Sequence, residues 1–420
     1  MMDVAMFVCG ILAVGAAFLI VGMQLRGQRR ILAAKASLVV GIVCLGFALV
    51  SLKFYPGAAL ASNTSDASSM GGMTMQQSGT QSGAVRKPEN STPQMAMMGV
   101  SSSAVGVTDA SSQALTQSQI AAQNKTAVDL MHEQGMVPKV LKDGTKQFTL
   151  TAAPVVWRLY QSRNVNDWGY NGSVPGPLIR VRVGDHVQIV LHNKLPEATT
   201  LHLQGISLPS DMDGVPGVSQ KPIASGGSFV YKFTVTPDMV GTHAYFSDMD
   251  ASKQIDAGLH GVLLVDPAHG KQYPKADVDA LFELGGLSVD SSPMENVFTM
   301  DGKPAPNAPQ LTVKVGQDVV VRLVNNTAQC YHAMHLHGYT FRVVAQDGHA
   351  LAKPISENVI SLAPAETADI EFVANNPGMW MFHCHILDHM TNPDDDVDEM
   401  GGLTTYFNVV QGGTTKGGMS

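Results

Sequence analysis

The sequence predicts an all-β protein of two tandem β-sandwich domains, preceded by two transmembrane helices and a disordered linker. After residue 141 the chain consists of short runs of alternating apolar and polar residues separated by Gly, Pro, Asn and Asp, which are strand and turn signals. One such pattern occurs twice, as LIRVRVGDHVQIVLHNKL (178–195) and as APQLTVKVGQDVVVRLVNNT (308–327). The repetition indicates two copies of one sandwich.

Composition limits the classes of protein that are possible. The chain has 27 Lys and Arg residues against 35 Asp and Glu residues, and a formal net charge of -8. No basic run is long enough to follow a phosphate backbone, so we expect no nucleic-acid partner. Two of the four cysteines, Cys9 and Cys44, lie in apolar N-terminal runs. The remaining pair, Cys330 and Cys384, is too small a set for a disulfide framework.

Two apolar runs near the N-terminus, 4–23 and 36–54, are each long enough to cross a bilayer as a helix. A cleaved signal peptide is the alternative for the first run, but its positive charges follow the apolar stretch instead of preceding it. Basic residues between the two runs place the connecting loop in the cytoplasm by the positive-inside rule. We therefore expect a two-helix anchor over 1–55 in the cytoplasmic (inner) membrane, with the rest of the chain on the periplasmic or extracellular side.

The segment 56–143 is rich in Ser, Gln and Met, has few aromatic residues and no apolar period, and predicts a disordered linker. Its methionine thioethers suit Cu(I), so they are candidates for collecting copper; the alternative is that methionine is incidental in low-complexity sequence. These residues are Met70, Met73, Met75, Met95, Met97 and Met98. We place the first domain at 144–268, the second at 269–412 and a tail at 413–420.

Histidines cluster near the C-terminus, where seven of the fourteen fall between His332 and His389. Such clustering is typical of a metal site. In MFHCHILDH (381–389), a strand would turn His383 and His385 to one side and Cys384 to the other. One strand can therefore serve two metal sites.

A thiolate with two imidazoles is the ligand set of a blue copper centre, usually with a weak axial methionine. Cys384 and His389 supply two of these ligands. In HAMHLHG (332–338), His335 and His337 share a face, which leaves His332 free to join Cys384. The sequence therefore predicts a blue copper site built from His332, Cys384 and His389.

HAMHLHG and HCHILDHM (383–390) resemble the two C-terminal copper motifs of multicopper oxidases. The resemblance extends through NGSVPGP (171–177), DGVPGVSQ (213–220) and GLHGVLLVDP (258–267). It implies cupredoxin-like Greek-key domains, with electrons entering at a type 1 copper bound by the trio above. Four further histidines would form half of a trinuclear type 2 and type 3 cluster that reduces dioxygen to water. These are His335, His337, His383 and His385.

The chain between GLHGVLLVDP and HAMHLHG is too short for an intervening domain. The sequence therefore resembles two-domain laccases. In those proteins the cluster forms between the first domain of one chain and the second domain of its neighbour, commonly in a trimer. The resemblance implies a homotrimer here.

The first domain departs from the family pattern at three cluster positions. The family's HxH pair is Leu201-His202-Leu203-Gln204 here, and its HSH pair is Phe246-Ser247-Asp248. By the resemblance, His202 joins His335 on the type 2 copper, and only a partial type 3 pair remains. A nitrite-reductase-like enzyme is therefore an alternative, although nitrite reductases carry their blue copper in the first domain, which has no cysteine here.

Two further positions follow from the resemblance. If TNPDDDV (391–397) is an insertion, Met400 falls at the axial position of the type 1 site, and we prefer it to Met390. Asp213 matches an acidic residue that assists protons near the cluster in the family. Its alternative role is that of a turn residue before Gly214.

Taken together, the resemblance implies a copper oxidoreductase that takes electrons from a small donor or a redox protein and passes them to an interdomain copper site. Dioxygen is the expected terminal acceptor. A different class is also open, namely a non-enzymatic protein that transfers electrons or handles copper, supplied with Cu(I) by the methionine-rich segment. The sequence does not identify the natural donor.

Overall fold

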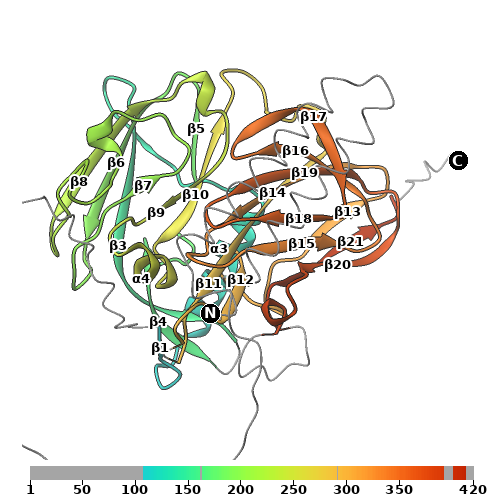
Figure 1. The fold of residues 1–420 in the computed structure, drawn as a ribbon, viewed down its shortest axis with the longest axis horizontal. Coiled ribbons are helices and arrows are strands. Elements are labelled where there is room, and N and C mark those ends of the chain that lie inside the picture. Colours follow the sequence, from blue (N-terminus) through green and yellow to red (C-terminus); the bar gives the residue numbers. More distant parts are fainter. Residues whose placement is uncertain (1–106, 161–162, 291, 392–400, 413–420) are drawn as a thin grey trace, which may run out of the picture. The chain divides into compact units, whose positions relative to one another are not determined.

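A computed structural model of the chain describes residues 107–160, 163–290, 292–391 and 401–412. These residues form two β-sandwich domains, which confirms the all-β prediction (Figure 1). The predicted membrane-spanning runs lie outside the described residues. Within the described ranges, no helix is both long enough and apolar enough to cross a bilayer.

The first domain consists of two sheets. One has the strand order β1-β4-β3-β6-β8, with β2 paired to β3, and the other has the order β5-β10-β9-β7. The strands of the first sheet are β1 (Thr108–Asp109), β2 (Lys139–Val140), β3 (Lys146–Arg158), β4 (Asn164–Tyr170), β6 (His186–Asn193) and β8 (Ser228–Thr234). Those of the second are β5 (Ile179–Arg182), β7 (His202–Leu203), β9 (Gly241–Phe246) and β10 (His260–Asp266), with the short helix α4 (Ala251–Asp256) between β9 and β10.

The second domain repeats this architecture with the orders β12-β11-β14-β19-β16-β17 and β13-β21-β20-β15-β18. Its first sheet contains β11 (Val278–Leu287), β12 (Val297–Met300), β14 (Asp318–Asn325), β16 (Phe341–Gln346), β17 (His349–Glu357) and β19 (Thr367–Val373). Its second sheet contains β13 (Leu311–Lys314), β15 (His332–Leu336), β18 (Val359–Leu362), β20 (Gly378–Cys384) and β21 (Thr404–Val410).

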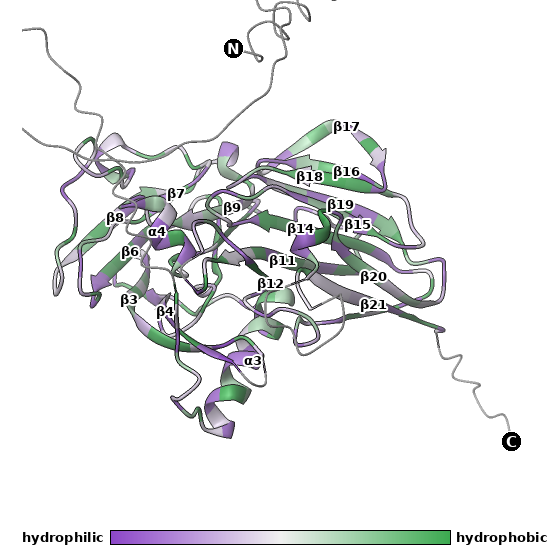
Figure 2. Ribbon diagram, turned by 60° about the horizontal axis from the view of Figure 1, so that its bottom comes forward, coloured by the Kyte–Doolittle hydropathy of each residue, from purple (hydrophilic) through white to green (hydrophobic). Residues whose placement is uncertain are grey.

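Each sandwich is held together by the inward-facing residues of its strands. Along β6, every second side chain is buried, as expected of a strand with one face on the core. The core of the second domain is rich in aromatic residues, and Phe282, Phe382 and Phe407 pack with ring centroids 5.2–6.0 Å apart. Hydrophobic residues recur along central strands such as β11 and β14 (Figure 2).

The predicted linker 56–143 is wrong for its C-terminal part, because helix α3 (Gln117–Met131) lies within it. Thr116 begins the helix with a capping box in which Gln119 is the reciprocal partner. Leu130 and Met131 are buried against the domains. Low local hydrophobicity hid the helix from sequence reasoning, since its stability comes from these tertiary contacts.

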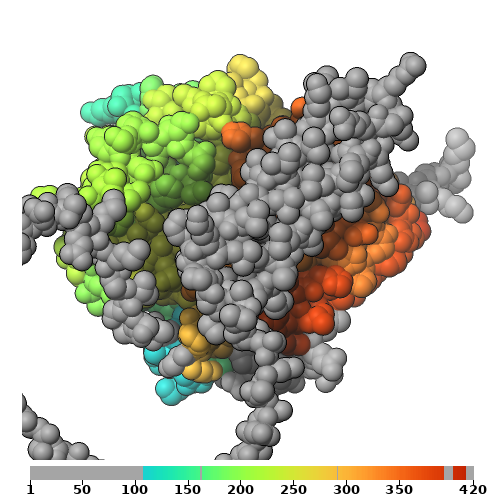
Figure 3. Space-filling view, viewed as in Figure 1, coloured from blue at the N-terminus to red at the C-terminus, as the bar shows by residue number. Residues whose placement is uncertain are grey.

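The two domains and the segment after α3 meet in a buried ionic network around Arg322, whose side chain is 2% exposed. Its guanidinium donates to Glu133 after α3 (2.7 Å), to Asp279 in the second domain (2.9 Å) and to Thr242 in the first domain (3.0 Å). The Trp157 indole adds a second link by donating to the Gly302 carbonyl across the domain boundary. In the space-filling view the first domain (green) adjoins the second (orange to red) (Figure 3).

Candidate metal centre

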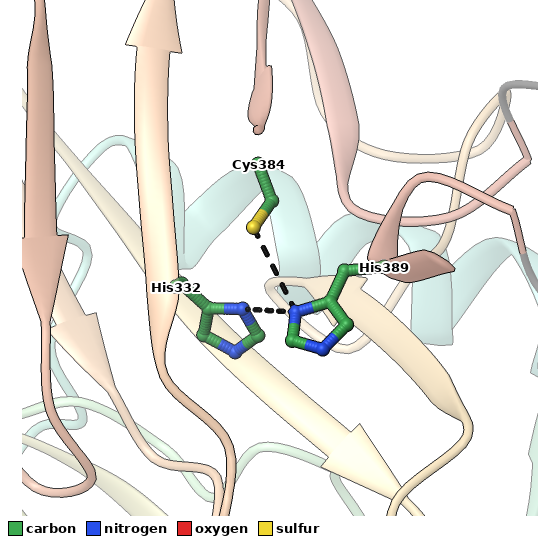
Figure 4. A group of neighbouring side chains, drawn as sticks. All are labelled: His332, Cys384 and His389. Atoms are coloured by element: carbon green, nitrogen blue, oxygen red, sulfur yellow. Dashed lines mark hydrogen bonds between the residues drawn. The ribbon is translucent and has the colours of Figure 1, made fainter. Parts of the chain in front are cut away.

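His332, Cys384 and His389 converge in the second domain (Figure 4). The Nδ1 atoms of the two imidazoles lie 3.1 Å apart, and the Cys384 Sγ lies 3.7 Å from the His389 Nδ1. Three candidate ligand atoms, one from each residue, all lie within 4.8 Å of one another. A thiolate and two imidazole nitrogens at this separation suit a single copper ion.

Strand pairing explains why these residues meet. In the register of β15 and β20, Met334 lies opposite Cys384 and His335 lies opposite His383. Since side chains alternate along a strand, His332 and Cys384 face the core together. A short helical turn, Leu387–His389, then carries His389 back over the same point. The structure therefore brings together the three residues that the sequence selected.

Burial prepares the trio for a metal. His332 and Cys384 are 0% exposed and His389 is 7% exposed. Burial lowers the pKa of His332 to about 3 and also lowers the pKa of His389, so both imidazoles are neutral at pH 7 with lone pairs to offer. Burial raises the pKa of the Cys384 thiol, while the backbone amides of Ile386 and Ala333 oppose this. A cation bound here would supply the charge that a buried thiolate requires.

Phe298 is a feature of this site that sequence reasoning missed. Its ring stacks on His389 with centroids 4.0 Å apart and meets His332 edge-on at 5.5 Å. The phenylalanine comes from β12, whose sequence carries no copper motif, so no signal in the sequence could have found it. Its ring closes one side of the trio and holds the His389 plane.

The predicted axial ligand Met400 lies outside the described residues. Met390, the alternative, is 9% exposed, and its backbone carbonyl accepts from the amide of Gly402 at 2.7 Å. The preference for Met400 over Met390 as the axial ligand of the type 1 site stays a prediction.

A second cluster lies on the opposite face of the same strands. The rings of His335, His337, His383 and His385 form a compact group with centroid separations of 4.7–5.8 Å. The Nε2 atoms of His337 and His383 are 3.0 Å apart. His383 is buried, whereas His385 is exposed. The cluster therefore opens onto the surface of its domain.

Hydrogen bonds at Nδ1 orient this cluster. The His383 Nδ1 lies 2.8 Å from the Cys384 carbonyl oxygen, and the His335 Nδ1 lies 2.5 Å from the Asn358 carbonyl oxygen. An imidazole that donates from Nδ1 to a carbonyl leaves its Nε2 as a free acceptor for a metal. Burial lowers the pKa of His383 to about 4, and neighbouring imidazoles add to the effect. These residues fit a copper site.

The first domain contributes a smaller group. The register of β7 and β9 places His202 opposite Phe246, with ring centroids 5.5 Å apart. The His202 Nδ1 lies 2.7 Å from the Asp213 backbone carbonyl, and its Nε2 lies 3.1 Å from the Gln204 Oε1. Burial raises the pKa of Asp248, and the nearby His202 opposes the shift. The three substituted positions thus remain grouped around His202.

The two groups are separate within one chain. Among the residues that the structure describes, no hydrogen bond, ion pair or ring contact joins His202 or its neighbours to the four-histidine cluster of the second domain. That these two groups supply the two halves of one copper site stays a prediction from the sequence.

Comparison with known proteins agrees with this geometry. Two family models described as "Multicopper oxidase" match residues 152–270 and 285–393, together more than half of the chain. Laccase-2 of Oryza sativa subsp. japonica is 28% identical over 256 residues, which cover 54% of this chain and 44% of that protein. A copper resistance protein A homolog of Pseudomonas syringae pv. tomato is 28% identical over 257 residues, covering 48% and 43% respectively. This chain spans less than half the length of these curated relatives.

Solved structures show the same similarity. The blue copper oxidase from Nitrosomonas europaea superposes with a TM-score of 0.58 at 28% identity, over 63% of this chain and 85% of that one. The multicopper oxidase mgLAC superposes with a TM-score of 0.59 at 30% identity, over 63% and 86%. Copper is the metal of this family, and the two histidine-rich clusters fit it. The chain belongs to the multicopper oxidase family.

Proposed function

We propose that the protein is a laccase-type copper oxidoreductase that takes electrons from a donor at a type 1 site and passes them to a second copper site. The observation that carries this proposal is the sequence His383-Cys384-His385 at the end of β20, which contributes to both histidine-rich clusters at once. Copper, when bound, supplies one-electron chemistry at both places. Dioxygen is the acceptor we favour.

The chain's own part is to hold the ligands and to connect the sites. Cys384 is bonded through the backbone to His383 and His385, so a covalent path of very few bonds links the trio to the second cluster. The His383 Nδ1 contact with the Cys384 carbonyl at 2.8 Å adds a hydrogen-bonded shortcut. Burial of the trio excludes water, which favours a site that exchanges electrons without rearranging.

We infer that the second site is completed between chains, in a homotrimer. The network around Arg322 and the Trp157 indole fix the two domains of one chain against each other. The four-histidine cluster is nevertheless open, with His385 exposed, and the first-domain group around His202 is half-buried. A neighbouring chain could bring its first domain to this opening, and three copies of such a head-to-tail interface would close a ring.

The two apolar N-terminal runs support an inner-membrane anchor with the copper domains on the periplasmic or extracellular side. This location agrees with the similarity to a copper resistance protein. The donor would be a small molecule or a redox protein that reaches the type 1 site from that side.

Two alternative functions are each favoured by one specific observation. Gln204, Phe246 and Asp248 replace three imidazoles, which favours a smaller second site of the kind that reduces nitrite. The methionine-rich segment favours a non-enzymatic role in electron transfer or copper handling.

The test is the copper content of the full chain in detergent, combined with electron paramagnetic resonance to separate type 1 from type 2 copper. About four copper ions per chain with oxygen consumption would support the oxidase. One or two ions per chain would support nitrite reduction or simple electron transfer, and a nitrite-dependent turnover assay would separate these. A chain without type 1 copper would overturn the proposal.

A further inference from the structure

Two carboxyl groups that belong to neither histidine cluster meet at the domain boundary. Asp256 ends helix α4 in the first domain, and Glu295 precedes β12 in the second domain, where it is 4% exposed. The Asp256 Oδ2 accepts from the Ser288 hydroxyl at 2.6 Å. Its Oδ1 is buried and no donor reaches it. The Glu295 carboxyl lies close enough to the Asp256 carboxyl for a hydrogen bond between the two side chains.

Glu295 holds the loop that leads to the type 1 trio. Its Oε1 accepts from the Ala328 amide at 2.5 Å and its Oε2 accepts from the Gln329 amide at 3.1 Å. The loop is fixed further along, because the side chains of Asn325 and Thr327 both donate to the Cys330 carbonyl. Strand β15 then begins at His332. The position of this ligand therefore depends on a loop that the Glu295 carboxylate holds at its start and that Asn325 and Thr327 hold further along.

The ionisable groups that the structure describes around Asp256 and Glu295 provide no positive charge to offset two carboxylates, so a proton between the two carboxyl groups would stabilise them. Burial, and next to it Glu295, raise the pKa of Asp256 to about 8, while the Ser288 hydroxyl opposes this. The other ionisable groups that face the pair are acidic: Asp167 on β4 and the Cys330 thiol on the loop. Lys253 on α4 binds Glu197 instead. Among the described residues no basic side chain hydrogen-bonds either carboxyl group.

We propose that Asp256 and Glu295 share one proton across the domain boundary and act as a positioning pair for His332, so that the type 1 site responds to the protonation of this pair. With the proton present, Asp256 donates to Glu295 and the loop stays clamped. Without it, two carboxylates face each other in a buried place, and their repulsion must move either α4 or the loop.

A route for the proton is also present. Asp167 lines a cavity of about 330 Å³ together with Trp168, Lys253 and Ala257, the residue after Asp256. One of the Asp167 carboxyl oxygens is buried without a partner. Since Asp167 and Asp256 are close enough to influence each other electrostatically, this cavity can bring solvent near the pair.

The experiment follows the type 1 absorption band and its paramagnetic resonance signal in the copper-loaded full chain between about pH 6 and pH 9.5. We expect one transition with its midpoint near pH 8 in the wild type. Asp256→Asn should abolish it, because an asparagine amide donates to Glu295 at every pH. The matched control is Asp290→Asn, an exposed carboxylate that binds Arg163, which should keep the wild-type midpoint.

A second readout needs no copper. The shared proton contributes stability that is fully present below the unfolded pKa of about 4 and is lost as the pH rises through about 8. Denaturant unfolding of the copper-free chain should therefore show a pH dependence that Asp256→Asn removes in part, leaving the share of other groups such as Glu133. Because this measurement uses the copper-free chain, it still tests the shared proton when a variant binds copper poorly.

The inference rests on the proposed type 1 site, and the outcomes separate the two. No type 1 signal at any pH would count against the proposed function and leave the copper-free measurement to judge the pair. A type 1 signal that does not change with pH, or a transition that survives in Asp256→Asn, would overturn the positioning role.

Discussion

The type 1 trio and the four-histidine cluster share strands β15 and β20 but are built to different degrees. The trio comes from one domain, its members are 0–7% exposed, and its candidate ligand atoms lie within 4.8 Å of one another. The second cluster is open, and the ligands that we propose for its other half lie in the first domain, where only His202 keeps an imidazole. Strand alternation and pairing bring Cys384 and His332 together within one domain, whereas the second site, in our proposal, depends on how domains and chains assemble.

This difference also explains where the sequence departs from its family. Gln204, Phe246 and Asp248 all lie in the first-domain group. None of them contacts the trio, so their replacement leaves the type 1 site untouched. The chain can therefore lose three imidazoles of the first-domain group and still keep all three ligands of the type 1 trio.

The largest expected effect is at the trio itself. Cys384→Ser removes the thiolate, and we expect complete loss of the blue absorption and of donor oxidation, measured by visible spectroscopy and stopped-flow reduction. Cys330→Ser is the matched control, since Cys330 is the other free, buried cysteine of the described chain. Blue colour that persists in Cys384→Ser would refute the assignment of the trio.

The next effect separates the two sites. His383→Ala should leave the blue band and single-turnover donor oxidation in place but reduce steady turnover by about 100-fold or more, because electrons no longer reach an acceptor. His349→Ala, an exposed histidine outside both clusters, serves as the control. Unchanged steady turnover in His383→Ala would favour a protein that only transfers electrons.

Restoring the family pattern tests the incomplete half. Where the wild type binds fewer than about four copper ions per chain, the triple variant Gln204→His, Phe246→His and Asp248→His should bind more copper than the wild type, as measured by elemental analysis. The single variant Gln204→Asn controls for a change at the exposed position. A wild-type chain that already holds about four ions would contradict the view that these substitutions weaken the second site.

The smallest effect concerns Phe298. Phe298→Leu removes a stacking contact worth about 1 kcal/mol, so type 1 copper should dissociate about fivefold faster while the blue band stays near its wild-type position. Chelator-driven copper release measures the rate. Phe407→Leu removes a stacked ring from the same domain core without touching a ligand, and should destabilise the fold without changing copper release.

Sequence reasoning reached the trio because its signals are local. Residues 381–389 contain two of the ligands, and the alternation of a strand separates Cys384 from His383 and His385. The same alternation of side chains along residues 332–338 separates His332 from His335 and His337, and so identifies His332 as the third ligand. The two-sandwich architecture was predictable for a similar reason, since the repeated turn and strand pattern recurs along the chain.

Other features had no local signal. Helix α3 has little apolar content, so its sequence predicts part of the disordered linker, although tertiary burial and Glu133 hold the helix in place. Phe298 and the Asp256–Glu295 pair lie in segments without motifs, and only folding brings them to their partners.

The sequence by itself determined the β-sandwich class, the ligand types and the division of one strand between two metal sites, because each follows from residue identity and a period of two. The tertiary structure decided which side chains surround the ligands and that, among the described residues, the group around His202 makes no hydrogen bond, ion pair or ring contact with the four-histidine cluster of the same chain. Such contacts join residues that are far apart in the chain, and their geometry is set by packing and domain orientation, which no local pattern encodes.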